Sequence, residues 1–389
     1  MGLGEESRQL LALAREFARD RLRPGARERD QNEESVDSEI MAEMGDLGFF
    51  GLRVPEEYDG LGLDVITYLR ILEELAFGDP CPALSVSVHN SLPVEILCKQ
   101  GTEEQRRAWL PLMATGEVLA AFSLSEAGAG SDAASLLTQA DCDGEGGWIL
   151  NGEKAWVTNG AAAGLTLMFA RTDQPGDRRR SKGIGAFLVP GGLPGLSAGK
   201  KERKMGQRGS ETVTMSLEDV RLGPEHLVGE SHKGFQYALE SLEGGRLGIA
   251  ALALGIAASA AEEAFRYSAE REQFGQAVRH FQGLEWILGE MSVKLEATRG
   301  LLERAARARE LGDVRARRLS SAVKLFASEA AGWITRRAVQ VHGGYGYSRE
   351  YAVERMFRDS RVTEIYEGAN EIHRSLAARL VYRERNVSA

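Results

Sequence analysis

The stretch ALALGIAASAAEEAFRYSAERE, residues 251–272, is rich in alanine at helical spacing. Small side chains at that spacing predict a helix that other helices can approach closely. Two more long segments share the helical period, LEWILGEMSVKLEATRGLLERAARARE at 284–310 and RRLSSAVKLFASEAAGWITRRAVQVHG at 317–343. Long helices joined by short connections predict a four-helix-bundle domain, which we assign to residues 233–389.

Ahead of this bundle, the sequence pattern changes twice along the chain. Residues 119–232 hold short runs such as GWILNGEKAWVTNG, LTLMFART and GIGAFLVP between turn residues, which predicts an antiparallel β-barrel or sandwich. Asn151-Gly152 in this region predicts a two-residue hairpin turn. Residues 1–118 are helical in pattern, and Thr102 is a predicted N-cap. We therefore predict an α+β multidomain fold, with helical, β and helical domains in that order.

The composition narrows the class of function. The 389 residues are 43% hydrophobic and 27% charged, as in a globular protein, and the net charge of -9 argues against a nucleic-acid partner. The basic segment at 171–182 has the Asp, Pro and Gly of an exposed loop. We expect no membrane span, because no run of 18 apolar residues occurs, and no metal, because the six histidines lack ligand spacing. Three scattered cysteines and an N-terminus without signal-peptide features predict a cytoplasmic protein.

Two segments of the β region have the composition of a ligand site. LSEAGAGSDA, residues 124–133, lacks the third glycine of a dinucleotide fingerprint, but Gly128, Gly130 and Ser131 can bring backbone N–H groups close to a phosphate. A plain turn is the alternative. In AWVTNG, residues 155–160, Trp156 and Thr158 lie two apart on a strand and so share a face. An indole wall beside a hydroxyl suits the edge of a flat heterocycle, and an ordinary core tryptophan is the alternative.

Further candidates come from the helical region. SLEGGRLGIA, residues 241–250, places Glu243 and Arg246 one turn apart, with two glycines between them that cost helix stability and leave room for a bound chain. A simple ion pair is the alternative. EREQFGQAVRHFQ at 270–282 and QVHGGYGYSRE at 340–350 each follow a helix and contain glycines that could be C-caps. TEIYEGANEIHR, residues 363–374, sets a lone carboxylate, Glu367, against Gly368.

Taken in order, these segments resemble the acyl-CoA dehydrogenase family over nearly the whole chain. The series is SEAGAGSD, AWVTNG, KMGQRGSETV, EGGRLGIA, REQFG, QVHGGYGY and EIYEGANEIHR. Its sequence pattern is similar to that of the short-chain (butyryl-type) branch. The resemblance implies noncovalent FAD between the sheet and the C-terminal helices. It also implies a homotetramer, a dimer of dimers, with FAD sites shared across an interface.

The resemblance assigns roles by position. On the FAD of the same chain it places Phe122, Leu124, Ser125, Gly130, Ser131, Trp156, Val157, Thr158, Ala369, Asn370 and Glu371. On the FAD of a neighbouring subunit it places Arg271, Phe274, Gln282, Gln340, Gly343 and Gly344. On the acyl-CoA substrate it places Ser131, Glu243, Arg246, Tyr366 and Gly368.

The resemblance also implies that Glu367 is the catalytic base. A minority branch carries its glutamate on the earlier helix, where this chain has Gly245. Gly368 would permit an open turn, and Asn370 could cap the next helix. A pocket that raises the pKa of the carboxylate would help it to remove the α-proton of a thioester.

The implied reaction converts an acyl-CoA to the trans-2-enoyl-CoA and passes electrons to electron-transfer flavoprotein. The alternatives are a flavin oxidase or monooxygenase on the same fold, and a noncatalytic acyl-CoA-binding protein. The acyl chain length and the pathway stay open at this stage.

Overall fold

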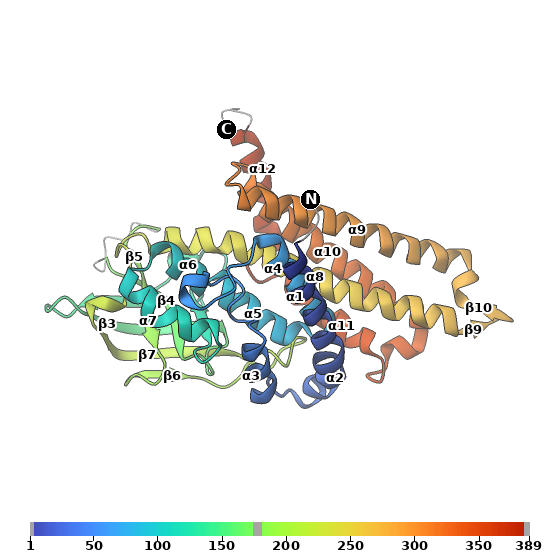
Figure 1. Cartoon of the computed structure of the whole chain (residues 1–389), viewed down its shortest axis with the longest axis horizontal. Coiled ribbons are helices and arrows are strands. Elements are labelled where there is room, and N and C mark those ends of the chain that lie inside the picture. Colours follow the sequence, from blue (N-terminus) through green and yellow to red (C-terminus); the bar gives the residue numbers. More distant parts are fainter. Residues whose placement is uncertain (1–3, 174–180, 385–389) are drawn as a thin grey trace.

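A computed structural model describes residues 4–173 and 181–384, so most of the predicted basic loop lies outside the described residues. Figure 1 shows the β-sheet at one end of an elongated molecule and the long C-terminal helices reaching the other end. The N-terminal elements are α1 (Glu5–Phe17), the π-helix η1 (Ala18–Leu22), α2 (Arg23–Asn32), α3 (Ser38–Asp46), α4 (Val65–Gly78), α5 (Pro80–Ser91), α6 (Pro93–Gln100) and α7 (Glu103–Ala114). Of these, α4, α5 and α6 pack against the longest helix, α8 (Gly234–Glu270).

The start of α7 confirms the predicted N-cap. The Thr102 hydroxyl accepts a hydrogen bond from Gln105 N at 3.2 Å, and the Gln105 side chain accepts one from Thr102 N at 3.0 Å. This capping box satisfies two N–H groups that the helix leaves unpaired. Gln105 also donates to Glu225 and Leu227 ahead of α8, which ties α7 to the sheet domain.

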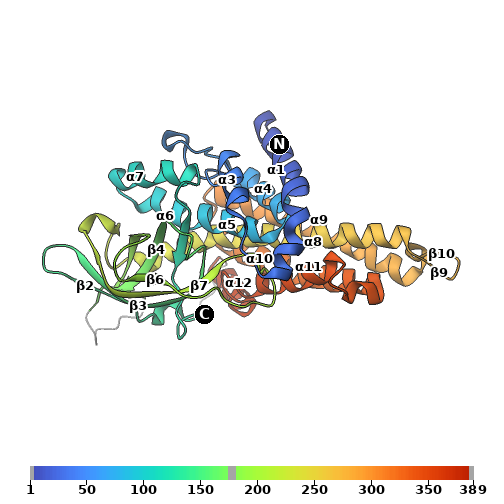
Figure 2. The ribbon, with the colours of Figure 1, turned by 90° about the horizontal axis from the view of Figure 1, so that it is seen from below.

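The middle region is one eight-stranded sheet, viewed edge-on in Figure 2. Seven strands follow the order β6-β7-β3-β2-β4-β5-β8, and β1 pairs with β4. Most pairs are antiparallel as predicted, but β1–β4 and β2–β4 are parallel. The strands are β1 (Ala120–Ser123), β2 (Gln139–Cys142), β3 (Trp148–Thr158), β4 (Leu165–Arg171), β5 (Ile184–Pro190), β6 (Leu196–Ala198), β7 (Thr212–Leu222) and β8 (Leu227–Val228).

The predicted hairpin turn at Asn151-Gly152 is wrong, because both residues lie inside β3. A Cβ on Gly152 would stand 2.7 Å from Thr138 Cα, and the pairing register with β7 shifts between Leu150 and Gly152. Glycine serves a bulge and a close backbone approach here, not a turn. The β2–β3 connection closes instead at Asp143 and Gly147, where Gly147 N donates to the Asp143 carboxylate at 2.8 Å.

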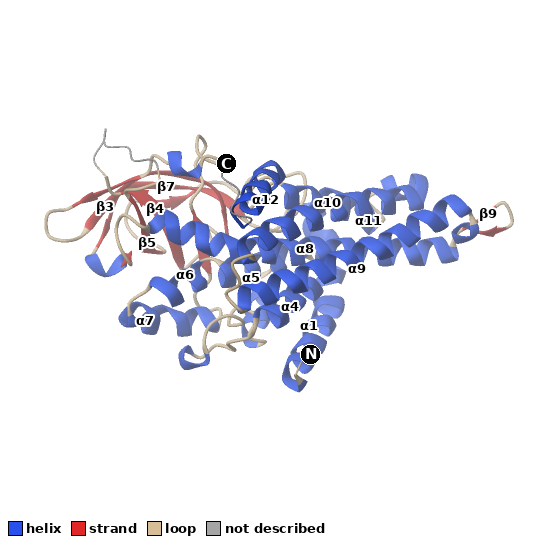
Figure 3. Ribbon diagram, turned by 90° about the horizontal axis from the view of Figure 1, so that it is seen from above, coloured by secondary structure: helices blue, strands red, loops and turns tan. Residues whose placement is uncertain are grey.

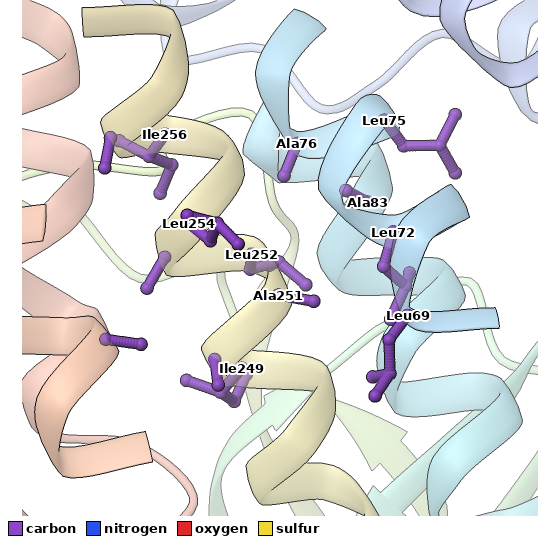
Figure 4. Packing of buried hydrophobic residues seen from close by; sticks show 14 of the residues in the cluster. Leu69, Leu72, Leu75, Ala76, Ala83, Ile249, Ala251, Leu252, Leu254 and Ile256 are labelled. Carbon is purple, nitrogen blue, oxygen red and sulfur yellow. The ribbon is translucent and has the colours of Figure 1, made fainter. Parts of the chain in front are cut away.

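The C-terminal bundle surrounds α8, as Figure 3 shows from above. Figure 4 shows Leu69, Leu72 and Ala76 of α4 beside Leu252 and its neighbours on α8, whereas the Leu75 side chain points away from α8. A Cβ on Gly255 would stand 2.8 Å from Ala76 Cβ, so small residues do allow the close approach predicted for this stretch. The other elements are the hairpin β9 (Glu272–Gln273) and β10 (Gln276–Ala277), then α9 (Gln282–Glu310), α10 (Ala316–His342), η6 (Gly343–Tyr347), α11 (Ala352–Arg361), η7 (Val362–Glu364) and α12 (Asn370–Glu384).

Among the described residues, α8 alone is long and apolar enough to cross a membrane. Its most apolar window is 89% buried inside the molecule. The helix is therefore placed as a core helix would be, packed against α4, α5, α9 and α10.

Candidate active site

The turn between η7 and α12 carries Glu367 in a left-handed backbone conformation, with φ of 55°, followed by Gly368 with φ of 100°. A non-glycine residue with positive φ is uncommon and persists where the surroundings hold it. The prediction of an open turn at Gly368 is confirmed. Two successive left-handed residues turn the Glu367 side chain away from solvent and toward α8.

The Glu367 carboxylate lies against Gly245 of α8. A Cβ on Gly245 would stand 2.5 Å from Glu367 Oε2 and 2.8 Å from Cδ, so no other residue type fits unless the carboxylate moves. The predicted room beside the helix exists, and a side chain of the same molecule occupies this part of it. Gly244 faces a different group, because its Cβ would meet Glu95 Oε2 at 2.6 Å.

Burial sets the electrostatics of this carboxylate. Glu367 Oε2 is shielded from solvent and has no hydrogen-bond partner. Desolvation raises the pKa of Glu367 to about 7, although the charges of Arg246 and Lys324 act in the opposite direction. A desolvated carboxylate with a free oxygen and a pKa near neutrality has the properties of a general base.

Arg246 brings a second buried charge to the same place. Its residue is 6% exposed, and its Nε and Nη1 atoms lack hydrogen-bond partners. The simple ion pair with Glu243 is wrong, because Glu243 lies 3.4 Å from Arg317 and 3.9 Å from Arg309 instead. Unpaired guanidinium nitrogens are costly to bury, so Arg246 is poised for an acceptor that a ligand would supply.

Residues of α10 and α12 hold the turn that carries Glu367. Lys324 Nζ donates to Gly368 O at 2.7 Å and to Asn370 Oδ1 at 3.1 Å. Asn370 also exchanges hydrogen bonds with Ser328, so its side chain binds α10 and does not cap α12 as predicted. His373 Nε2 lies 3.2 Å from Glu367 O, and burial lowers the pKa of His373 to about 3.

Sequence reasoning missed Lys324 and His373. A signal for Lys324 was available, because Lys324 stands in register with Ser320, Ser328 and Ala331 on the face of α10 that is otherwise small or apolar. A lysine at such a position is fully buried only when its ammonium group has partners.

The segment KMGQRGSETV joins the turn to the sheet. Gln207, with φ of 46°, donates from Nε2 to Tyr366 Oη at 3.3 Å and to Asp359 O at 3.1 Å. Thr212 begins β7 and pairs with Thr158 at the end of β3. This segment therefore contacts the turn through Gln207 and the end of β3 through Thr212.

The glycine loop and β3 form a second group of predicted residues. A Cβ on Gly128 or Gly130 would meet nothing within 4 Å, and Ser131 is exposed. Trp156 is 63% exposed with φ of 61°, so it is not the core tryptophan of the alternative reading. Ser125 O accepts from Ala155 N at 2.9 Å, which ties the loop to β3. Val157 is buried, whereas Trp156 is exposed and Thr158 is half-buried. The pairing register shifts between Lys154 and Val157, so the regular alternation on which the predicted shared face rested is interrupted at Trp156.

This group fits FAD in kind. An open glycine-containing backbone accommodates phosphate, and an exposed indole on a strand edge provides a flat apolar wall. Phe122 and Leu124 complete the loop from β1, with the Phe122 ring 5.1 Å from that of Phe169. Beyond the turn, Ala369 is half-buried and Glu371 is exposed beside Arg374.

A third group lies at the far end of the bundle, around β9 and β10 (Figure 1). Arg271 stands over the Tyr345 ring at 5.7 Å, and Phe274 is 95% exposed. These residues cannot line the loop at Trp156 in the same chain, because the sheet is at the opposite end. The structure gathers on this exposed tip the residues predicted to serve a neighbouring subunit, namely Arg271, Phe274, Gln282, Gln340, Gly343 and Gly344.

Glu243 lines a cavity of about 620 Å³ among α4, α5, α6, α8 and the facing ends of α9 and α10. Its walls combine apolar groups such as Tyr68 and Leu247 with the charged groups Arg309 and Arg317. Gly244 opens onto the same space. This is a cleft of the size that small-molecule ligands occupy.

Comparison with known proteins identifies this arrangement. Three models, the N-terminal, middle and C-terminal domains of acyl-CoA dehydrogenase, match residues 4–117, 121–220 and 232–382. The chain belongs to the acyl-CoA dehydrogenase family. The short-chain-specific acyl-CoA dehydrogenase of Clostridium acetobutylicum is 39% identical over 384 residues, which cover 98% of this chain and 99% of that protein.

Solved structures agree with the family assignment. Butyryl-CoA dehydrogenase from Megasphaera elsdenii matches with a TM-score of 0.95 at 38% identity, covering 98% of this chain and all (100%) of that one. A chain in the structure of the electron transferring flavoprotein of Acidaminococcus fermentans matches with a TM-score of 0.95 at 39% identity, covering 98% and 99% of the two chains. The protein is an FAD-dependent oxidoreductase, an acyl-CoA dehydrogenase.

Proposed function

We propose that this acyl-CoA dehydrogenase acts on short acyl-CoA thioesters and that Glu367 removes the α-proton. The observation that carries the assignment is the Glu367 carboxylate, which has a free, shielded Oε2 and a pKa of about 7 against Gly245. A carboxylate of ordinary pKa is too weak a base for an α-proton, so the raised value matters. Position 245, where a minority branch carries its glutamate, is a glycine in this chain, which supports Glu367 as the base.

The chain's own residues divide the work. The turn aims the Glu367 carboxylate at the α8 surface, and the unpaired guanidinium of Arg246 supplies positive charge where negative charge develops on the substrate. Phe122, Ser125, Gly130, Ser131, Trp156 and Thr158 would hold FAD on the sheet side. When bound, FAD accepts the β-hydrogen as hydride, which completes the α,β-dehydrogenation.

The proposal also covers the substrate-binding cavity, the electron acceptor and the oligomeric state. The cavity beside Glu243 is proposed to take the CoA or acyl portion, and the short-chain and butyryl-CoA relatives favour a short chain. Electron-transfer flavoprotein is the proposed acceptor, supported by the likeness to a chain in such a structure. We also propose a homotetramer, since the residues around Phe274 lie on an exposed tip, away from the sheet of their own chain. A cytoplasmic location is proposed from the three scattered cysteines.

The test is anaerobic mixing of the purified holoenzyme with butyryl-CoA, octanoyl-CoA or isovaleryl-CoA, followed by loss of the oxidised flavin absorbance. Butyryl-CoA is expected to reduce the flavin fastest. Glu367→Gln is expected to keep bound FAD and to lower the reduction rate by roughly 10²–10⁴-fold, the range for loss of a general base.

The outcomes separate the alternatives. A Glu367→Gln enzyme that is reduced as fast as the wild type would remove Glu367 from the base role. Stoichiometric oxygen uptake during aerobic turnover would indicate the oxidase. A colourless protein that binds butyryl-CoA would indicate the noncatalytic binding protein.

A further inference from the structure

Lys324 is a buried cation beside the turn that carries Glu367. The proposed reaction assigns it no role. It lies in the middle of α10, its side chain is fully buried, and its ammonium group reaches across to the turn before α12. It donates to Gly368 O at 2.7 Å and to Asn370 Oδ1 at 3.1 Å. The carbonyl that it binds belongs to the residue directly after Glu367.

The backbone conformation shows why such a contact is needed. Glu367 is a non-glycine residue with φ of 55°, a conformation that must be held by its surroundings. His373 contacts Glu367 O at 3.2 Å from one side, and Lys324 contacts Gly368 O from the other. Gln207 fixes the preceding residue through Tyr366 Oη at 3.3 Å. Of these three partners only Lys324 brings a charge, because burial keeps His373 neutral.

The charges that face Glu367 come from several elements. Arg246 of α8 and Lys324 of α10 are the cations that favour its ionised form, and neither donates a hydrogen bond to Glu367 Oε2. Lys324 in turn faces the acidic groups Glu364 of η7 and Glu371 of α12 as well as Glu367. Glu371 is paired with Arg374, and Glu364 with Arg361.

We propose that Lys324 is a positioning residue for the Glu367 base: its ammonium group clamps the left-handed turn and keeps a positive charge beside the carboxylate. The clamp orients the carboxylate toward α8, and the charge keeps it ionised in a site that otherwise favours the neutral acid. This rests on Glu367 being the base, as proposed above. Burial lowers the pKa of Lys324 itself to about 8, so the charge is present at neutral pH and is lost in alkaline solution.

Two substitutions separate the charge from the contact. Lys324→Gln keeps a donor within reach of Gly368 O but removes the charge, and Lys324→Arg keeps the charge. We expect the pKa of Glu367 to rise by about 1 unit in Lys324→Gln, since a nearby opposite charge shifts a carboxylate by one or more units, and to be restored in Lys324→Arg. Below pH 7, the rate of flavin reduction in Lys324→Gln should then be about tenfold lower than in the wild type.

The direct readout is an infrared pH titration of the protonated carboxyl band of Glu367 in the holoenzyme, assigned by its absence in Glu367→Gln. The matched control is Lys154→Gln, which removes a second fully buried lysine that pairs with Glu126 in the sheet domain. That control is expected to leave the titration of Glu367 unmoved. A surface control, Lys233→Gln, breaks only an exposed pair with Glu230.

The results decide between the two proposals. Glu367 titrating at the same pH in the wild type and in Lys324→Gln, with an unshifted rate–pH profile, would overturn the role of Lys324 and leave the base assignment intact. An active Glu367→Gln would overturn both. A shift that also appears in Lys154→Gln would mean general destabilisation and would equally overturn the specific role of Lys324.

Discussion

Two carboxylates of this enzyme, Glu126 in the sheet domain and Glu367 in the helical domain, have pKa values that are shifted in opposite directions. Glu126 Oε1 lies 2.8 Å from Lys154 Nζ and accepts from the Thr138 hydroxyl, and Oε2 accepts from Leu137 N. Its pKa is lowered, because these partners outweigh desolvation. Glu367 has cations nearby but a free Oε2, and its pKa is raised. Direct hydrogen bonds therefore stabilise the ionised form of Glu126, whereas desolvation without such bonds at Oε2 raises the pKa of Glu367.

The largest effect is expected from a substitution that displaces the Glu367 carboxylate. Gly245→Ala would place a Cβ 2.5 Å from Glu367 Oε2 and force the carboxylate to move. A misplacement of about 1 Å can lower a rate by about 10²-fold, so we expect a loss of that order in flavin reduction with FAD still bound. The matched control is Gly300→Ala in α9, where a Cβ meets nothing within 4 Å. Equal rates in wild type and Gly245→Ala would contradict the described packing.

The opposite test leaves the structural carboxylate without its cation. Lys154→Met should lower the free energy of unfolding by about 3–5 kcal/mol, since Glu126 would remain buried and unpaired. Denaturant unfolding of the variant measures the loss. Lys233→Met, which breaks an exposed ion pair with Glu230, should leave the free energy of unfolding nearly unchanged, because solvent screens such pairs. A similar small change in Lys154→Met would show that Glu126 does not depend on this pair.

A third test compares the pH dependence of stability. The pKa of Glu367 is raised from 4.5 to about 7 in the folded protein, so its contribution to stability is complete below pH 4.5 and is lost as pH rises through about 7. Relative to Glu367→Gln, the wild type should therefore lose about 3 kcal/mol of unfolding free energy across that range. Unfolding curves for both proteins at several pH values measure it. Parallel curves would mean that the carboxylate is not desolvated.

Much of the fold follows from local pattern. The alanine-rich stretch of α8 and the Thr102 cap are set by near neighbours, so periodicity and capping rules predict them. The hairpin prediction at Asn151-Gly152 was wrong because Gly152 packs against Thr138, the residue just before β2, and the local sequence does not encode that contact. The parallel pairing of β1 with β4 is equally nonlocal.

The candidate site divides in the same way. The order of the motifs along the chain predicted Glu367 and Arg246 as site residues, and it grouped the residues around Phe274. Motif order could not predict the contact between Lys324 and the turn. Lys324 lies on a separate helix, 43 positions before Glu367, and it reaches the turn only after the bundle has packed. The prediction that Asn370 caps α12 was wrong on similar grounds. Its partner, Ser328, is distant in sequence, so the local pattern does not reveal the contact.

The packing of Gly245 against Glu367 also bears on how such sites can change during evolution. Positions 245 and 367 belong to different elements but share one small volume, which holds a single carboxylate. A chain that gained a side chain at 245 would have to shorten or move the one at 367. We therefore expect these two positions to vary together among relatives, so that a change in the location of the acid requires paired substitutions and not independent ones.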